Sequence, residues 1–141
     1  MRKTIATRLK ESQNTCASLT TVQEIDMTAL MAWRSKYKED VAKEHNVRLG
    51  YMGAFAMATT LAAKQIPQVN ASIDTDREII VYRDYVDISI AVSSPKGLVT
   101  PVVRNCESMS IIELEAEIGR LASKVNPYHF CLIAINSNSP L

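Results

Sequence analysis

Apolar side chains recur at helical spacing in four stretches of the chain, residues 2–14, 28–44, 51–66 and 111–124. Within each stretch they fall three or four positions apart, as Ile5 and Leu9 do, which places them on one face of a helix. The third helix is predicted to end before Pro67, because proline disfavours helical geometry in the residue that precedes it. Ser110 and Glu113 match a capping box, which predicts that the fourth helix begins directly after the serine.

Strands are predicted where the period changes to two or where β-branched residues gather. The clearest alternation covers residues 86–92, whose apolar side chains point one way and whose intervening residues point the other, so one buried face is expected. A turn at 94–97 returns the chain into a partner strand at 98–103, interrupted at Pro101, which lacks an N–H. Further strands are predicted over residues 15–25 and, as a hairpin, over 69–74 and 78–82.

The ends of two helices carry more specific signals. Asp26 or Thr28 is expected to cap the second helix by accepting a hydrogen bond from an orphan backbone N–H. His45 lies near the C-terminus of that helix, where a cation is favoured by the dipole, and this structural use is preferred over a catalytic base. The fourth helix is broken ahead of Pro127, and an apolar run then reaches Ile135, followed by residues with the composition of a frayed end.

Composition narrows the class of protein without indicating a reaction. The 141 residues, 47% hydrophobic and 22% charged, suffice for one packed α/β domain. A net charge of +1 does not predict a nucleic-acid partner, and no apolar run approaches the ~20 residues that cross a bilayer. Cys16, Cys106 and Cys131 lack the spacing of a disulfide framework or zinc site, so a reducing compartment is predicted. The basic residues 1–10 resemble a mitochondrial presequence, but a folded helix is preferred.

Candidate chemistry is sparse. The only histidines are His45 and His129, and no nucleophile elbow, phosphate loop, dinucleotide fingerprint or zinc-protease motif occurs. Arg34, on the second helix, can face either solvent or an anionic ligand, and the solvated position is the simpler interpretation. Ser93 and Ser94 end the clearest strand beside a tight turn, where hydroxyls often meet ligands, although turn chemistry explains them equally well.

Six short motifs follow one another in a fixed order, at residues 2–11, 14–21, 24–27, 69–74, 81–89 and 97–105. Together they resemble the catalytic domain of the E2 acyltransferases of 2-oxo acid dehydrogenase complexes, from residue 1 to about residue 124. The segments VNASID and GLVTPVVRN recur across that family, whereas the other four motifs look most like its succinyltransferase branch. An acetyl or branched-chain acyl relative stays open as an alternative.

The resemblance implies a chloramphenicol acetyltransferase-like α/β fold, a mixed sheet flanked by helices that is incomplete here, in homotrimers that build a hollow core. It implies succinyl transfer between dihydrolipoyl-lysine and coenzyme A in the 2-oxoglutarate dehydrogenase complex of the tricarboxylic acid cycle. The lipoyl group and the contacts with the E1 and E3 components are expected on domains that these residues lack. No metal, nucleic acid or membrane is implied. The expected location is the mitochondrial matrix in a eukaryote and the cytoplasm in a bacterium.

Carried onto this chain, the resemblance implies that Arg34 and Ser93 contact coenzyme A. Gly50 and Ala122 stand where some relatives offer polar contacts, so those two contacts are not expected. The family's base lies in an Asp-His-Arg-x-x-Asp-Gly motif, and its oxyanion-binding hydroxyl lies in a Gly-Thr-Phe-Thr-x-Ser-Asn segment. Neither occurs in this sequence, so no catalytic residue is assigned.

Residues 1–124 are therefore interpreted as the N-terminal half of a catalytic domain, and residues 125–141 as a divergent tail. The half domain is expected to be inactive alone. It is also expected to aggregate, because the apolar faces of residues 86–92 and 111–121 would lack partners. The alternative from another class is a non-catalytic subunit that keeps these elements for assembly.

Overall fold

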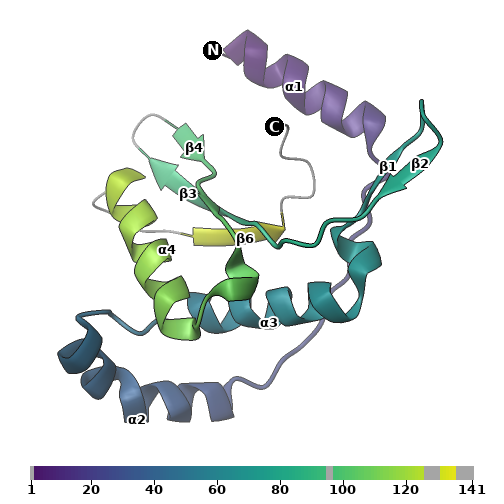
Figure 1. The fold of residues 1–141 in the computed structure, drawn as a ribbon. Coiled ribbons are helices and arrows are strands. Elements are labelled where there is room, and N and C mark those ends of the chain that lie inside the picture. Colours follow the sequence, from purple (N-terminus) through teal and green to yellow (C-terminus); the bar gives the residue numbers. More distant parts are fainter. Residues whose placement is uncertain (1, 95–96, 126–130, 136–141) are drawn as a thin grey trace.

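The computed structural model describes residues 2–94, 97–125 and 131–135 (Figure 1). The helices are α1 (Arg2–Thr15), α2 (Thr28–His45), α3 (Met52–Gln65) and α4 (Ile111–Val125), with 3-10 turns η1 (Pro67–Asn70) and η2 (Cys106–Ser108). The strands are β1 (Ser72–Asp74), β2 (Ile79–Val81), β3 (Ile88–Ser94), β4 (Gly97–Val99), β5 (Val102–Val103) and β6 (Cys131–Ile135). All four predicted helices are confirmed. Among the described residues, no helix combines the length and the apolar character needed to cross a membrane.

The start of α4 forms as its local sequence predicts, whereas the start of α2 differs from the prediction. The Ser110 backbone N–H donates to Glu113 Oε2 at 2.7 Å, and the Glu113 N–H donates to Ser110 Oγ at 3.3 Å, which is the capping box of α4. At α2 the N-cap is Met27, which has no side-chain cap bond, so the predicted cap at Asp26 or Thr28 is wrong. Asp26 lies one residue earlier, and its Oδ1 accepts from both the N–H and the hydroxyl of Thr28. These bonds, led by the one from the Thr28 hydroxyl, lower the pKa of Asp26.

The prediction of a strand over residues 15–25 is wrong. The chain is irregular from Cys16 to Met27, and Leu19 and Val22 are 95% and 85% exposed. β-branched residues favour extended backbone, but a strand also needs a neighbouring edge to satisfy its backbone groups. None of the described strands pairs with this segment.

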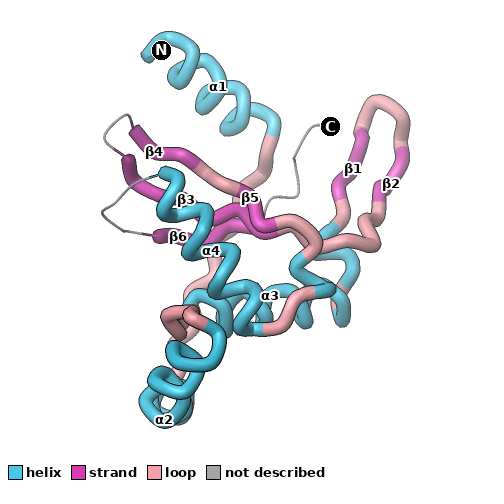
Figure 2. Tube along the Cα trace, turned by 60° about the vertical axis from the view of Figure 1, so that its left-hand side comes forward, coloured by secondary structure: helices cyan, strands magenta, loops and turns pink. Residues whose placement is uncertain are grey.

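The main sheet is built around β3, with β4 and β5 along one edge and β6 along the other (Figure 2). Every described pair is antiparallel. β4 and β5 continue one register against β3, and the gap between them lies at Pro101. The Ile90 N–H donates to the Pro101 carbonyl at 3.1 Å, but proline has no N–H to return the bond, so the predicted interruption is confirmed. The predicted hairpin is confirmed as the separate two-stranded sheet of β1 and β2, but its first strand begins at Ser72 rather than at residue 69, because residues 67–70 form η1.

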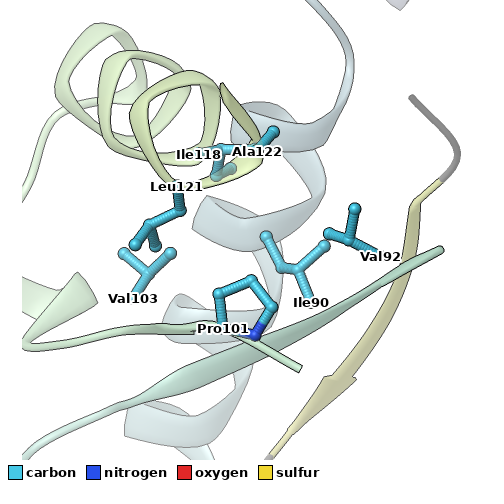
Figure 3. A pocket seen from close by; sticks show the side chains of 7 residues that line it. All are labelled: Ile90, Val92, Pro101, Val103, Ile118, Leu121 and Ala122. Atoms are coloured by element: carbon cyan, nitrogen blue, oxygen red, sulfur yellow. The ribbon is translucent and has the colours of Figure 1, made fainter. Parts of the chain in front are cut away.

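The core lies between β3 and the helices α3 and α4. Figure 3 shows side chains of β3 and β5 facing Ile118, Leu121 and Ala122 of α4 across a cavity of about 10 Å³. Ile88 and Leu114 are fully buried at 0% exposure. The apolar faces of residues 86–92 and 111–121 therefore cover each other. The expectation that they lack partners is wrong.

Two predicted burial patterns also need correction. The second face of β3 is buried at the start of the strand and becomes exposed only at Ser93. Asp87, just before β3, is buried and held by Arg104 and by the Asn105 N–H, while Ser89 Oγ is buried with no hydrogen-bond partner among the described residues. Conversely, no residue of α2 is fully buried. The helix lies at the periphery of the molecule (Figure 1), so the stripe that includes Trp33 is only partly covered.

Candidate functional site

Arg34 ties α2 to the connection between α2 and α3. Its Nε–H donates to the Leu49 carbonyl at 2.9 Å, and its Cζ lies 4.9 Å from the centroid of the Tyr51 ring. Leu49 is itself 1% exposed, so the acceptor belongs to a well-anchored part of the backbone. Arg34 is therefore held in place by neighbours, in contrast to the freely solvated position that the spacing alone suggested.

A hollow of about 510 Å³ opens beside Arg34, and we call it the α2 hollow. Three cationic side chains, Arg34, Lys38 and Arg48, line it together with a single acidic one, Glu39. Guanidinium and ammonium groups recognise phosphate and carboxylate oxygens. The hollow thus has the charge and the donors expected of a site for an anionic ligand.

A second hollow, of about 560 Å³, lies between the same connection and α4, and we call it the α4 hollow. Gly50 and Ala122, the two positions where some relatives place polar contacts, both line it. It shares Asn46, Val47 and Arg48 with the α2 hollow, so the two adjoin across one short piece of chain. The fold therefore gathers three of the four positions singled out in the sequence.

Glu115 is the one acidic residue among those described that line the α4 hollow, and the sequence alone did not point to it. It is 8% exposed, and its Oε1 accepts a 2.8 Å hydrogen bond from the Gly53 N–H at the N-terminus of α3, where the helix dipole favours a carboxylate. Burial raises the pKa of Glu115, while hydrogen bonds from Gly53 and Gly50 and the charge of Arg34 oppose that rise. The available signal was its position next to Leu114 on the inward side of an amphipathic helix.

Ser93 lies elsewhere. It is exposed on β3 opposite Leu98, and neither hollow includes it. The carboxyl end of β3 and the helix α2 lie towards opposite ends of α4 in both views (Figures 1 and 2). The structure therefore does not place Ser93 in the hollow that Arg34 lines.

The remaining candidates have structural roles or fall outside the described residues. Burial raises the pKa of the Cys106 thiol to about 11, so it is neutral near pH 7, and its Sγ lies 3.3 Å from the Val103 carbonyl that it bonds. His45 is the last residue of α2, as predicted. His129 lies outside the described residues. Within the described part of the chain, no three His, Cys, Asp or Glu residues gather as a metal site would require.

One family of proteins shares this sequence over most of its length. Residues 1–128 match the 2-oxoacid dehydrogenases acyltransferase (catalytic domain) family, and the chain belongs to that family. This confirms the resemblance carried by the six motifs.

Particular relatives narrow the comparison. The chain is 60% identical over 124 residues to the mitochondrial dihydrolipoyllysine-residue succinyltransferase component of the 2-oxoglutarate dehydrogenase complex of Saccharomyces cerevisiae, covering 88% of this chain and 26% of the relative. It is 51% identical over 124 residues to that component of Rickettsia typhi, with coverage of 88% and 31%. The cubic core of a pyruvate dehydrogenase multienzyme complex superposes with a TM-score of 0.81 at 32% identity, covering 87% of this chain and 50% of that one. The chain thus spans about a quarter of the yeast relative, and the fold class is confirmed.

Proposed function

We propose that this chain forms the N-terminal part of the catalytic domain of a dihydrolipoyllysine-residue succinyltransferase, and that its α2 hollow binds coenzyme A through Arg34. The observation that carries the proposal is the placement of Arg34: the residue that the family resemblance assigns to coenzyme A lines a hollow with two further cations. Identity of 60% to a succinyltransferase, against 32% to a pyruvate dehydrogenase core, favours succinyl over acetyl as the acyl group.

Coenzyme A suits a hollow of this chemistry because its phosphates are anions and its pantetheine arm is long and polar. The Arg34 guanidinium keeps N–H donors beyond the Nε–H that Leu49 accepts, and these suit phosphate oxygens. Ser93 stays a proposed contact, serving a part of this elongated coenzyme that lies away from Arg34.

In the proposed reaction, a base takes the proton of the attacking thiol, and the sulfur adds to the carbonyl carbon of the acyl thioester. The intermediate then collapses by breaking the bond to the original sulfur, and the departing thiolate takes the proton back from the base. Succinyl passes in this way between dihydrolipoyl-lysine and coenzyme A. A general base contributes about 10²- to 10⁴-fold, and an oxyanion donor about 10²- to 10³-fold. The printed sequence contains neither of the family's motifs for these groups. We therefore propose that these 141 residues bind coenzyme A but transfer succinyl far more slowly than a whole domain.

Isothermal titration of the folded chain with coenzyme A tests the proposal. Arg34→Ala is expected to weaken coenzyme A binding by about tenfold or more, because a charge-assisted contact to phosphate is lost. Lys43→Ala, on the same helix but not among the residues lining the α2 hollow, is the matched control and should change the affinity less than twofold. Pantetheine, which lacks the phosphates, should bind both variants equally. A folded wild-type chain that does not bind coenzyme A would refute the assignment.

We also propose that the chain assembles with copies of itself into a trimer-based core. Support comes from the superposition on a cubic core and from apolar side chains left exposed in one chain, among them Leu19 and Val22 in the irregular segment 16–27. Sedimentation velocity should show a concentration-dependent trimer, and Leu19→Ser with Val22→Ser should shift it towards monomer. If the chain assembles with a complete relative yet binds no coenzyme A, the alternative of a non-catalytic assembly subunit is favoured.

The division into a half domain, residues 1–124, and a divergent tail, residues 125–141, is likewise a proposal. The lipoyl group and the E1 and E3 contacts are assigned to other domains, and the location to the mitochondrial matrix in a eukaryote or the cytoplasm in a bacterium. β6 within the tail pairs with β3 from Ile88↔Ile135 to Val92↔Cys131. A chain ending at Val125 should therefore exchange the β3 amides that β6 covers faster with deuterium.

A further inference from the structure

The chain between α2 and α3, residues 46–51, separates the two hollows, and we call it the Leu49 loop. From α2, Arg34 holds it through the Leu49 carbonyl and the Tyr51 ring. From α4, Glu115 meets its other side at Gly50 and at Gly53, just beyond the loop. The Leu49 loop is therefore contacted on one side by a cation from α2 and on the other by a carboxylate from α4.

Glu115 packs closely against Gly50 and Gly53. A Cβ added at Gly50 would lie 2.9 Å from Glu115 Oε2, and one added at Gly53 would lie 2.6 Å from Glu115 Cγ. Real Cβ atoms essentially never approach so closely, so both positions require glycine while Glu115 stays where it is. Glu115 is buried and hydrogen-bonded to the Gly53 N–H, so moving its carboxylate away from the loop would break that bond.

We propose that Glu115 is a positioning residue for Arg34: through Gly50 and Gly53 it fixes the Leu49 loop, and the loop then fixes the Arg34 guanidinium at the wall of the α2 hollow. This inference rests on the proposed function, since it gives Arg34 the task of binding coenzyme A. It adds Glu115, on α4, to the residues on which coenzyme A binding depends.

The sign of the effect separates positioning from simple electrostatics. Removing a negative charge near an anion site strengthens the binding of phosphates if charge is all that matters. Removing a support for the Leu49 loop weakens it, because Arg34 loses its fixed orientation. Glu115→Ala therefore gives opposite results under the two accounts.

The experiment is a double-mutant cycle on the full 141-residue chain, titrated with coenzyme A. Glu115→Ala is expected to weaken binding about fivefold when Arg34 is present and by less than about 1.5-fold when Arg34 is alanine. Glu115→Gln keeps an oxygen acceptor for Gly53 and is expected to restore most of the affinity. Glu113→Ala, on the same helix but in the capping box, is expected to lower Tm without changing the affinity.

The outcomes distinguish a failure of the positioning role of Glu115 from a failure of the proposed binding of coenzyme A by Arg34. Unchanged or tighter binding by Glu115→Ala, or an equal loss with and without Arg34, overturns the positioning role. If Arg34→Ala itself leaves coenzyme A binding unchanged, the proposed function fails instead. If Glu115→Ala does not fold, Gly50→Ala is tested in its place, because the Cβ added at position 50 displaces the Glu115 carboxylate from the loop. Gly50→Ala is then expected to weaken coenzyme A binding only when Arg34 is present, and any other result overturns the inference.

Discussion

Gly53→Ala tests the packing around Glu115 most directly. The new Cβ would lie 2.6 Å from Glu115 Cγ and 2.9 Å from the Ile111 carbonyl oxygen, which is backbone and yields little. Forcing a methyl group into a filled space costs about 1–3 kcal/mol. Weakening the bond from the Gly53 N–H to a buried carboxylate adds about 1.5–3 kcal/mol, and the better helix propensity of alanine offsets about 1 kcal/mol.

The net expectation is a loss of about 1.5–5 kcal/mol in the free energy of unfolding, or about 5–20 °C in Tm for a chain of this size. Gly119→Ala is the matched control, because Gly119 lies inside α4 and its added Cβ would have no atom within 4 Å beyond the neighbouring backbone of the helix itself. That variant should gain about 1 kcal/mol from helix propensity. Urea denaturation followed by circular dichroism measures both. A Gly53→Ala chain as stable as Gly119→Ala would refute the close contact between α3 and α4.

Three further outcomes are expected. Leu114→Ala, at a site with 0% exposure in the core, should cost about 2–5 kcal/mol in urea denaturation, and a loss below about 1 kcal/mol would contradict the described core. Burial raises the pKa of Glu115 above its usual 4.5, so folding favours the protonated carboxyl. The wild-type chain should therefore lose stability relative to Glu115→Gln as pH rises from the ordinary glutamate pKa through the raised one. Parallel curves of Tm against pH for the two chains over that window would contradict the raised pKa. Iodoacetamide at neutral pH should label the exposed Cys16 and spare Cys106, whose pKa is about 11, and rapid labelling of Cys106 in peptide mass spectra would contradict its burial.

Local sequence alone determined the elements whose stabilising partners are near in the chain. The capping box of Ser110 and Glu113 set the start of α4, because both of its bonds close within one turn. The interruption at Pro101 followed from a missing N–H, a property of the residue itself. Arg34 was identified as a site residue through family resemblance, since its spacing carried no such information.

Only the tertiary structure decided where distant segments meet. Residues 16–27 have the composition of a strand, but none of the described strands pairs with them, and they stay irregular. Glu115 is 62 residues from Gly53 in the chain. The residues around either position do not predict that a carboxylate from α4 lies at the N-terminus of α3. The joining of Gly50, Ala122 and Arg34 around adjacent hollows has the same cause, because it depends on how α2, α3 and α4 pack together.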